Sequence, residues 1–209
     1  MSTYKFITIT AATCPAENRS AALVDLGHFA QDCRENGAER VTYGSVISGR
    51  YPGALIFVQM FDGLDGFETI MDVIPKSAAY TRMLSTHGVV PFVRNVLRGK
   101  DIPFEPKMDP RPNYLMLTRA HRKTLEETEF LSLLAKTAPS FKAAGAQTMR
   151  IGHTITGSDI GTYMLGVTYP NMAAIEATYD ALANDTAYAK VVSGVEIDMR
   201  SIIKVSGML

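Results

Sequence analysis

Two stretches of the chain repeat one another and decide how it is built. Residues 37–53 read GAERVTYGSVISGRYPG, and residues 145–161 read GAQTMRIGHTITGSDIG. Both begin with Gly-Ala and carry further glycines at matching places, 108 positions apart. In each stretch a β-rich run ends at a loop bounded by glycines, which is typical of one strand entering a hairpin. A constant offset of this kind predicts a duplicated unit.

The repeat extends outward from these stretches. The same offset relates Leu23 and Leu26 to Leu131 and Leu134, and the pair Ala79-Tyr80 to Ala187-Tyr188. Between the copies, residues 100–113 hold prolines at positions 103, 106, 110 and 112. Proline fixes φ and removes a backbone donor, so this segment is predicted to be an extended, stiff linker. The expected organisation is a first unit at 1–99, a linker at 100–113 and a second unit at 114–209.

Each unit has the pattern strand, helix, strand, strand, helix, strand. Residues 4–12 and 114–120 begin the units as β-rich runs, and apolar spacing predicts helices after them. Pro75 is expected to interrupt the second helical segment of the first unit, and Pro139 is expected to kink or interrupt the first helix of the second. The order βαββαβ predicts a four-stranded antiparallel sheet with both helices on one face.

The strands are apolar on both faces. In residues 55–61, LIFVQMF, both alternating sets of side chains are mainly apolar. An antiparallel sheet with one wet face would alternate polar and apolar residues, so both faces must be covered. The helices cover one, and the sheet of the sister unit is the natural cover for the other. The sequence therefore predicts an α+β protein in which two fused ferredoxin-like βαββαβ units close into an intramolecular α/β-barrel.

With its repeat, element order and two-faced strands, the chain resembles the dimeric α/β-barrel superfamily. That superfamily includes cofactor-free monooxygenases, haem-degrading enzymes, chlorite dismutases, muconolactone isomerases, EthD-like proteins and NIPSNAP-like proteins. The resemblance implies a ligand pocket between the helices and the sheet of a unit, and in some haem-binding branches a histidine on a helix there. Because one fold serves many functions, it does not imply a reaction.

Composition excludes several partners. Lys+Arg and Asp+Glu are both 21, so the formal net charge is zero and a basic surface for nucleic acid or anionic membrane is not expected. No run of about 18 apolar residues predicts a membrane span. The N-terminus has no secretory pattern, and Cys14 and Cys33 are too few for a disulfide framework. The expected compartment is the cytoplasm.

Four polar residues of the first unit are the candidate site. Tyr43, Gln59 and Asn95 stand in apolar strands, and His87 stands at the end of the second helical segment. No metal-ligand spacing or nucleotide-binding motif occurs, so no metal site is expected. At the offset of 108 the counterparts of these residues are all apolar: Ile151, Val167, Ile203 and Val195. The sequence therefore predicts one working pocket per chain, in the first unit.

Three functions remain open at this stage. The first is a small-molecule-binding protein or cofactor-free enzyme, monooxygenase- or isomerase-like, acting on an apolar or aromatic compound. In it His87 would transfer a proton, while Tyr43, Gln59 and Asn95 would orient the ligand. The second is haem binding through His87, and the third is a non-enzymatic structural or assembly barrel. In that third case side chains would fill the cavity, and His87 would only complement the helix dipole. Tyr43, Gln59 and Asn95 would then pair with neighbouring backbone or lie at the rims of the barrel. A homodimer of fused barrels stays an option.

Overall fold

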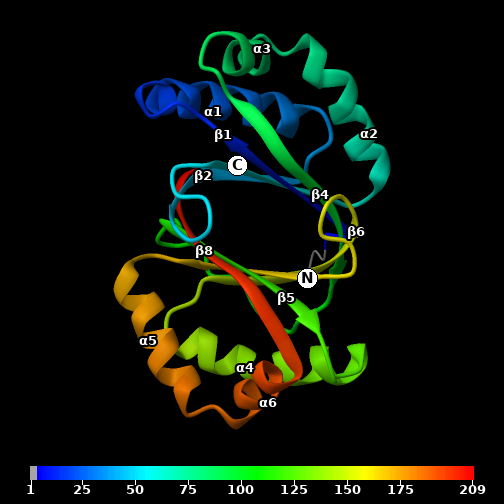
Figure 1. The fold of residues 1–209 in the computed structure, drawn as a ribbon, viewed down its shortest axis with the longest axis vertical. Coiled ribbons are helices and arrows are strands. Elements are labelled where there is room, and N and C mark those ends of the chain that lie inside the picture. Colours follow the sequence, from blue (N-terminus) through cyan, green and yellow to red (C-terminus); the bar gives the residue numbers. More distant parts are fainter. Residues whose placement is uncertain (1–3) are drawn as a thin grey trace.

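A closed barrel lies between two layers of helices in the computed structural model, which describes residues 4–209. Figure 1 shows α1, α2 and α3 above the barrel and α4, α5 and α6 below it. No helix in the described part of the chain is long and apolar enough to cross a membrane. The strands are β1 (Phe6–Thr13), β2 (Arg40–Ser48), β3 (Leu55–Phe61), β4 (Val90–Lys100), β5 (Tyr114–Arg122), β6 (Thr148–Thr156), β7 (Tyr163–Tyr169) and β8 (Val195–Met208). The α-helices are α1 (Arg19–Glu35), α2 (Leu64–Val73), α3 (Ala78–Ser85), α4 (Glu127–Ala143), α5 (Met172–Ala183) and α6 (Thr186–Gly194).

Each half contributes four antiparallel strands, and two junctions join the halves. The strand order around the barrel is β1-β3-β2-β8-β5-β7-β6-β4, with β4 returning to β1. The junctions are β2 with β8 and β4 with β6, so each unit's outer strands pair with the other unit. This confirms the predicted fold of two ferredoxin-like units closing into one barrel. Closure leaves neither sheet with an open edge.

The two faces of the strands pack into separate cores. One face of β1, β3 and β5 points into the barrel, where it forms a core that belongs to both units. The opposite face packs against that unit's own helices. The inner core contains, among others, Ile7, Ile9, Ile56, Val58, Leu97, Leu115, Leu117, Met164 and Ile203. The strands are therefore apolar on both faces because one face packs in the shared inner core and the other against helices, as the sequence predicted.

Proline acts differently in the two units. Pro75 stands in a short 3-10 turn, Ile74–Lys76, that separates α2 from α3, as expected. The expectation for Pro139 was wrong in so far as it predicted an interruption, because α4 runs through it from Glu127 to Ala143. An internal proline costs roughly 3 kcal/mol. Beyond Pro139 the helix still buries Phe141 completely, a side chain whose burial contributes about 1.5–3 kcal/mol, and this burial offsets much of the cost.

The two units differ by two residues just before their last strands. Thr10 pairs with Arg94 across β1 and β4, while Thr118 pairs with Arg200 across β5 and β8. Thr10 and Thr118 are 108 residues apart, whereas Arg94 and Arg200 are 106 apart. The second unit is therefore shorter by two residues in the turn that contains His87 in the first.

This offset corrects two of the counterparts that the gapless repeat predicts. The partner of Asn95 in β1 is Ile9, and the partner of Ser201 in β5 is Leu117, so Asn95 corresponds to Ser201 and not to Ile203. Val195 corresponds by the same register to Val89, and His87 belongs to a longer turn that the second unit lacks. The counterparts of Tyr43 and Gln59 are unaffected.

The shared inner core predicts that half a chain does not fold as a soluble monomer. A fragment of residues 1–105 would expose the barrel face of its sheet and the free edges of β2 and β4. Monomers rarely expose apolar patches of more than a few hundred Å². Sedimentation of the purified fragment should give aggregate or a homodimer that mimics the barrel. A stable, soluble monomer would contradict this account of closure.

Candidate functional site

A small cavity lies between the first unit's sheet and its helices. Its volume is about 40 Å³, and its walls come from α1, the α2–α3 turn, α3 and strands β1, β3 and β4. Most of the wall is apolar. The polar groups on it belong to Thr10, Gln59, Tyr80 and Arg94. This is the place between helices and sheet where the resemblance implies a pocket.

Gln59 lines this cavity with one hydrogen-bonding group unused. Its side chain is only 4% exposed, and its Oε1 accepts a hydrogen bond of 3.0 Å from Thr8 Oγ1. Its Nε2 is buried and makes no hydrogen bond with the described residues, although the Cys33 thiol, a weak acceptor, lies near Gln59. An unsatisfied buried donor costs about 1–3 kcal/mol. A ligand acceptor in the cavity would remove that cost.

Arg94 lines the same cavity with weak partners. Its Nε donates to Thr10 Oγ1 at 3.3 Å and its Nη1 to Met71 Sδ at 3.7 Å. A thioether is a poor acceptor. No carboxylate of residues 4–209 forms an ion pair with Arg94. The first unit therefore holds a cation, beside Gln59, whose charge the described protein does not neutralise.

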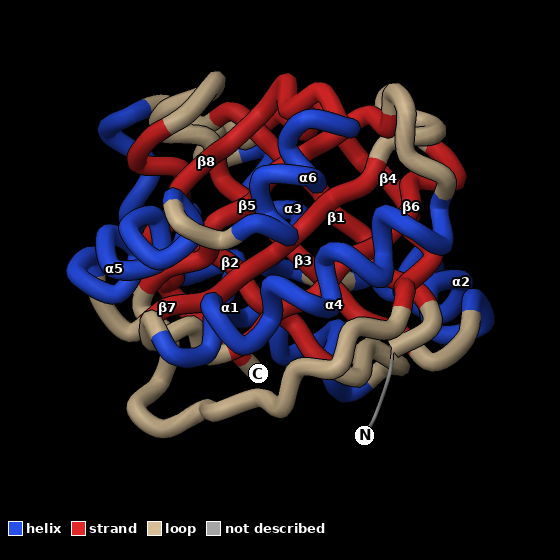
Figure 2. Tube along the Cα trace, turned by 90° about the horizontal axis from the view of Figure 1, so that it is seen from below, coloured by secondary structure: helices blue, strands red, loops and turns tan. Residues whose placement is uncertain are grey.

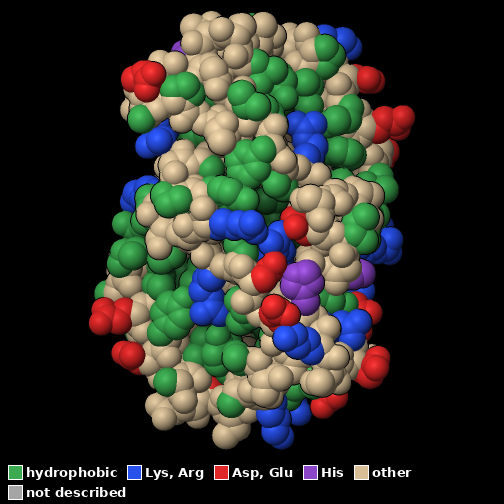
Figure 3. All heavy atoms as spheres, in the orientation of Figure 1, with side chains coloured by type: hydrophobic (Ala, Val, Ile, Leu, Met, Phe, Trp, Pro, Cys, Tyr) green, Lys and Arg blue, Asp and Glu red, His purple; other side chains and the backbone are tan. Residues whose placement is uncertain are grey.

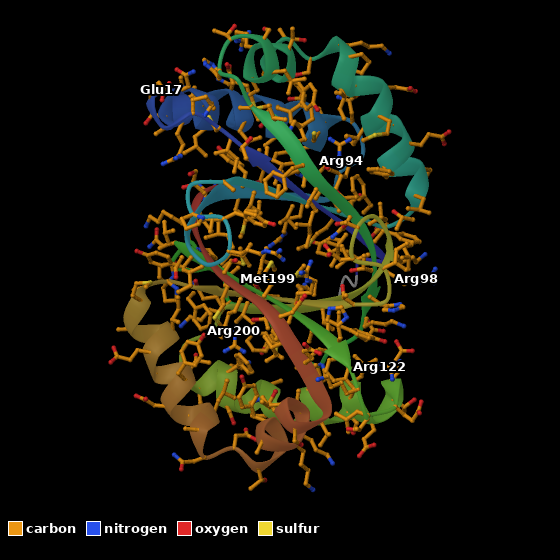
Figure 4. All side chains as sticks on the ribbon, viewed as in Figure 1. Glu17, Arg94, Arg98, Arg122, Met199 and Arg200 are labelled. Atoms are coloured by element: carbon orange, nitrogen blue, oxygen red, sulfur yellow. The ribbon has the colours of Figure 1, made fainter. Side chains whose placement is uncertain are left out.

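The second unit has an equivalent arginine, Arg200, with different hydrogen-bond partners. Its own helix–sheet cavity also measures about 40 Å³. Arg200 donates from Nε to Thr118 Oγ1 at 3.3 Å, from Nη1 to Tyr179 Oη at 3.4 Å and from Nη2 to Tyr188 Oη at 3.2 Å. Tyr179 takes the place of Met71, and Val167 takes the place of Gln59. Figure 4 labels the two arginines in opposite halves of the molecule.

The structure does not bring the four predicted site residues together. Only Gln59 lines the first unit's cavity. Tyr43 packs in the partly buried margin of the core, where its ring covers Gly207 and its hydroxyl lies over Gly27, leaving no room for a side chain at either glycine.

Asn95 faces the other side of its strand. Its Nδ2 donates to Asp159 Oδ2 at 2.7 Å, and its Oδ1 accepts from the backbone N–H of Ser158 at 3.1 Å. Asp159 and Ser158 belong to the loop between β6 and β7. Asn95 therefore ties a first-unit strand to a second-unit hairpin and does not reach the cavity under the helices.

His87 belongs to a charged cluster between α1 and the end of α3. Its Nε2 lies 3.0 Å from Asp25 Oδ2, and Arg82 donates from Nε and Nη2 to the same carboxylate, at 2.6 Å for the shortest contact. Asp25 is buried, and the Arg82 guanidinium, with help from His87, lowers its pKa to about 2. His87 does not line the cavity, although Leu84, at the end of α3, and Val89, just before β4, do.

These residues do not fit a haem held by His87. An axial histidine needs a ring nitrogen that faces the cofactor, and Nε2 of His87 faces Asp25. The adjacent cavity, at about 40 Å³, is far below the roughly 300–1,000 Å³ of sites that enclose larger ligands.

Sequence reasoning missed Arg94 and Arg200. A gapless offset places Ile202 opposite Arg94, which hides the repeated arginine. The signal that could have revealed them is a pair of threonines, Thr10 and Thr118, at the same position in the first strand of each unit. Each is paired with an arginine on the last strand of its unit. The two arginines align only if a two-residue gap is placed in the repeat at the turn that contains His87. The second unit has no histidine there that would show where this gap belongs.

The fold, with two ferredoxin-like units closed into one barrel and a cavity between helices and sheet in each unit, is the fold that the resemblance to the dimeric α/β-barrel superfamily predicted. The chain belongs to the family described as a domain of unknown function, DUF6854, whose model matches residues 4–99 and 112–205. No curated protein matches the chain by sequence.

Solved structures share the fold over nearly the whole chain. A candidate monooxygenase from Lactobacillus acidophilus is 13% identical with a TM-score of 0.71, covering 98% of this chain and 95% of that one. An anthrone oxidase-like protein is 12% identical with a TM-score of 0.62, covering 98% and 93%. A chlorite dismutase variant from Candidatus Nitrospira defluvii is 8% identical with a TM-score of 0.61, covering 98% and 92%. At these identities the likeness concerns the fold alone.

The Asp25 cluster predicts a pH-dependent contribution to stability. Because the folded-state pKa of Asp25 is lowered from 3.8 to about 2, its contribution is complete above about pH 4 and is lost as the pH falls toward 2. Asp25→Asn should lower the free energy of unfolding by about 1–3 kcal/mol at pH 7. Urea unfolding at pH 7 and at pH 2 measures the effect.

Asp72→Asn, at an exposed position on α2, is the matched control and should change little at either pH. If Asp25→Asn destabilised the protein equally at both pH values, the assigned ion pair would be wrong.

Proposed function

We propose that the protein binds a small apolar compound bearing a hydrogen-bond acceptor, in the helix–sheet cavity of the first unit. The single observation that carries this proposal is a pair of under-used donors on a mainly apolar wall: Gln59 Nε2 has no hydrogen-bond partner, and the Arg94 guanidinium has only Thr10 and the weak acceptor Met71. Buried polar groups in native proteins normally have partners. A ligand carbonyl, phenolate or carboxylate would be the missing one.

The ligand is expected to be an aromatic or alicyclic compound with one such group. The apolar part of the wall includes Phe29, Phe57 and Met83, and aromatic and thioether side chains suit a flat apolar body. An anionic acceptor would gain most, because hydrogen bonds between charged groups are roughly twice as strong as neutral ones.

Binding requires the cavity to widen. In its present form it holds about 40 Å³, the space of one or two water molecules. The 3-10 turn at Ile74–Lys76 separates α2 from α3, and Ile74 itself lines the cavity. Displacement of α3 about this turn would admit one ring without breaking a continuous helix.

His87 acts in this proposal as a positioning residue. By holding Asp25 it ties the turn after α3 to α1, and this turn lies between Leu84, at the end of α3, and Val89, which are both on the cavity wall. His87→Ala should therefore weaken binding, and His87→Gln, which keeps an N–H donor for Asp25, should restore part of it.

Methionine methyl NMR with benzoate as the probe tests the proposal. Met83 lines the first cavity and Met116 the second, so each reports on one unit. We expect the Met83 methyl signal to shift and to saturate as a single site in the first-unit cavity. Arg94→Gln should raise the dissociation constant by about tenfold or more, because a charge-assisted hydrogen bond contributes about 1.5–3 kcal/mol.

Arg200→Gln is the matched control, since Arg200 has the equivalent position on the last strand of its unit and donates to the equivalent threonine, Thr118. It should leave benzoate binding at Met83 unchanged. No shift at Met83, equal shifts at Met83 and Met116, or an equal effect of Arg200→Gln would each contradict the proposal.

A further inference from the structure

The two ends of the barrel differ in how their buried charged side chains are paired. At the end formed by the β2–β3 and β6–β7 hairpins, Arg119 forms ion pairs with Asp159 and with Asp198, the latter at 2.8 Å. Asn95 and His121 join the same network. Figure 3 looks onto this end and shows acidic, basic and histidine side chains close together. The positive charge inside this end is therefore compensated.

At the opposite end, two arginines that line the barrel interior have no carboxylate partner among the described residues. Figure 2 shows the loop between β4 and β5 running along this end, near the C-terminus. Arg40 begins β2, Arg150 lies in β6, and both line the barrel interior. Arg40 donates to Met108 Sδ at 3.7 Å and Arg150 to its neighbour's backbone oxygen at 3.2 Å. Among residues 4–209, no carboxylate forms an ion pair with either arginine.

The surroundings of Arg150 disfavour the charged form of its guanidinium. Burial lowers the pKa of its guanidinium, and the nearby Arg40 lowers it further, while Tyr4 acts in the opposite direction. Two like charges held together in a partly buried place destabilise the fold unless an anion joins them. The arrangement is the reverse of the compensated network at the hairpin end.

A cavity large enough for a ligand adjoins these arginines. It measures about 460 Å³ and lies between the barrel end and the linker, with Phe104, Lys100 and Asp101 on its walls. The ammonium of Lys100 is engaged by Glu127 at 2.6 Å, and Asp101 is exposed and bonds to neither arginine. The volume falls within the usual range for small-molecule sites.

This cavity continues toward the apolar interior of the barrel. Ile7, Arg40 and Arg150 line both the large cavity and a second space of about 50 Å³ inside the barrel. The inner space is bounded mainly by aliphatic side chains such as Ile9, Leu97 and Leu117. An occupant would meet two cations at the entrance and apolar side chains beyond them.

We propose that the linker end of the barrel is a second binding site, for a small organic anion. Its carboxylate or phosphate group binds the guanidinium groups of Arg40 and Arg150, and its apolar part lies toward Ile7. One arginine comes from each unit, so the site exists only in the closed barrel. It is separate from the first-unit cavity and does not depend on the function proposed for it.

The test uses two probes on the full chain, inorganic phosphate and hexanoate, at constant ionic strength. Met149 lines the large cavity and Met208 the inner space, so their methyl signals report occupancy. We expect one or both probes to shift these signals saturably. Arg40→Gln and Arg150→Gln should each weaken binding by at least about tenfold.

The matched control is Arg98→Gln, which removes an exposed arginine of β4 that stacks on Phe6. It should leave both affinities within about twofold. Without probe, Arg150→Gln should unfold at the same or a higher temperature than the parent, because it removes a repelled charge. That result separates lost binding from lost folding.

Binding by hexanoate alone would show that the apolar part is needed, and binding by phosphate alone that the charge suffices; either supports the site. The proposal is overturned if neither probe shifts Met149 or Met208, or if both arginine variants bind like the parent. Because Met83 reports on the first-unit cavity, failure here and failure of the proposed function are distinguishable.

Discussion

The pairing of β2 with β8 and of β4 with β6 is the constraint on which the rest of the structure depends. Each unit alone would be an open sheet with two unpaired edges and an uncovered apolar face. The two junctions remove the edges and enclose that face as an inner core common to both units. They also bring Arg40 and Arg150 together at one end, and Asn95 and Asp159 at the other.

Duplication produced two equivalent helix–sheet cavities, and a few substitutions made them unlike. Both keep a threonine and an arginine in the same register. In the second unit, Tyr179 and Tyr188 satisfy the arginine, and Val167 replaces the polar Gln59. In the first unit, Met71 is a weak substitute for a phenol, and Gln59 keeps an unused donor. The difference between the cavities therefore lies in how many donors the protein itself satisfies.

The fold was predictable because it follows from periodicities: the repeat, the prolines of the linker and strands apolar on both faces. The candidate site was harder to predict from the sequence, because its composition depends on which side of a strand each residue faces. Gln59 lines the first-unit cavity, and its counterpart Val167 is correct because its strand register is regular. Asn95 was paired with the wrong counterpart because a two-residue gap shifts the last strand, and the same gap hid Arg94. Pro139 shows a further limit, since α4 continues through it and burial of Phe141 offsets much of the cost of the proline.

Native-state hydrogen exchange tests the central claim, that neither unit is stable without the two junctions. Amides of the β2–β8 and β4–β6 ladders should exchange only through global unfolding, with the same free energy and denaturant dependence as those of β1–β3 and β5–β7. One common isotherm for both units is the predicted result. Junction amides that exchange by a lower-energy opening, while each unit's own ladders stay protected, would contradict the account.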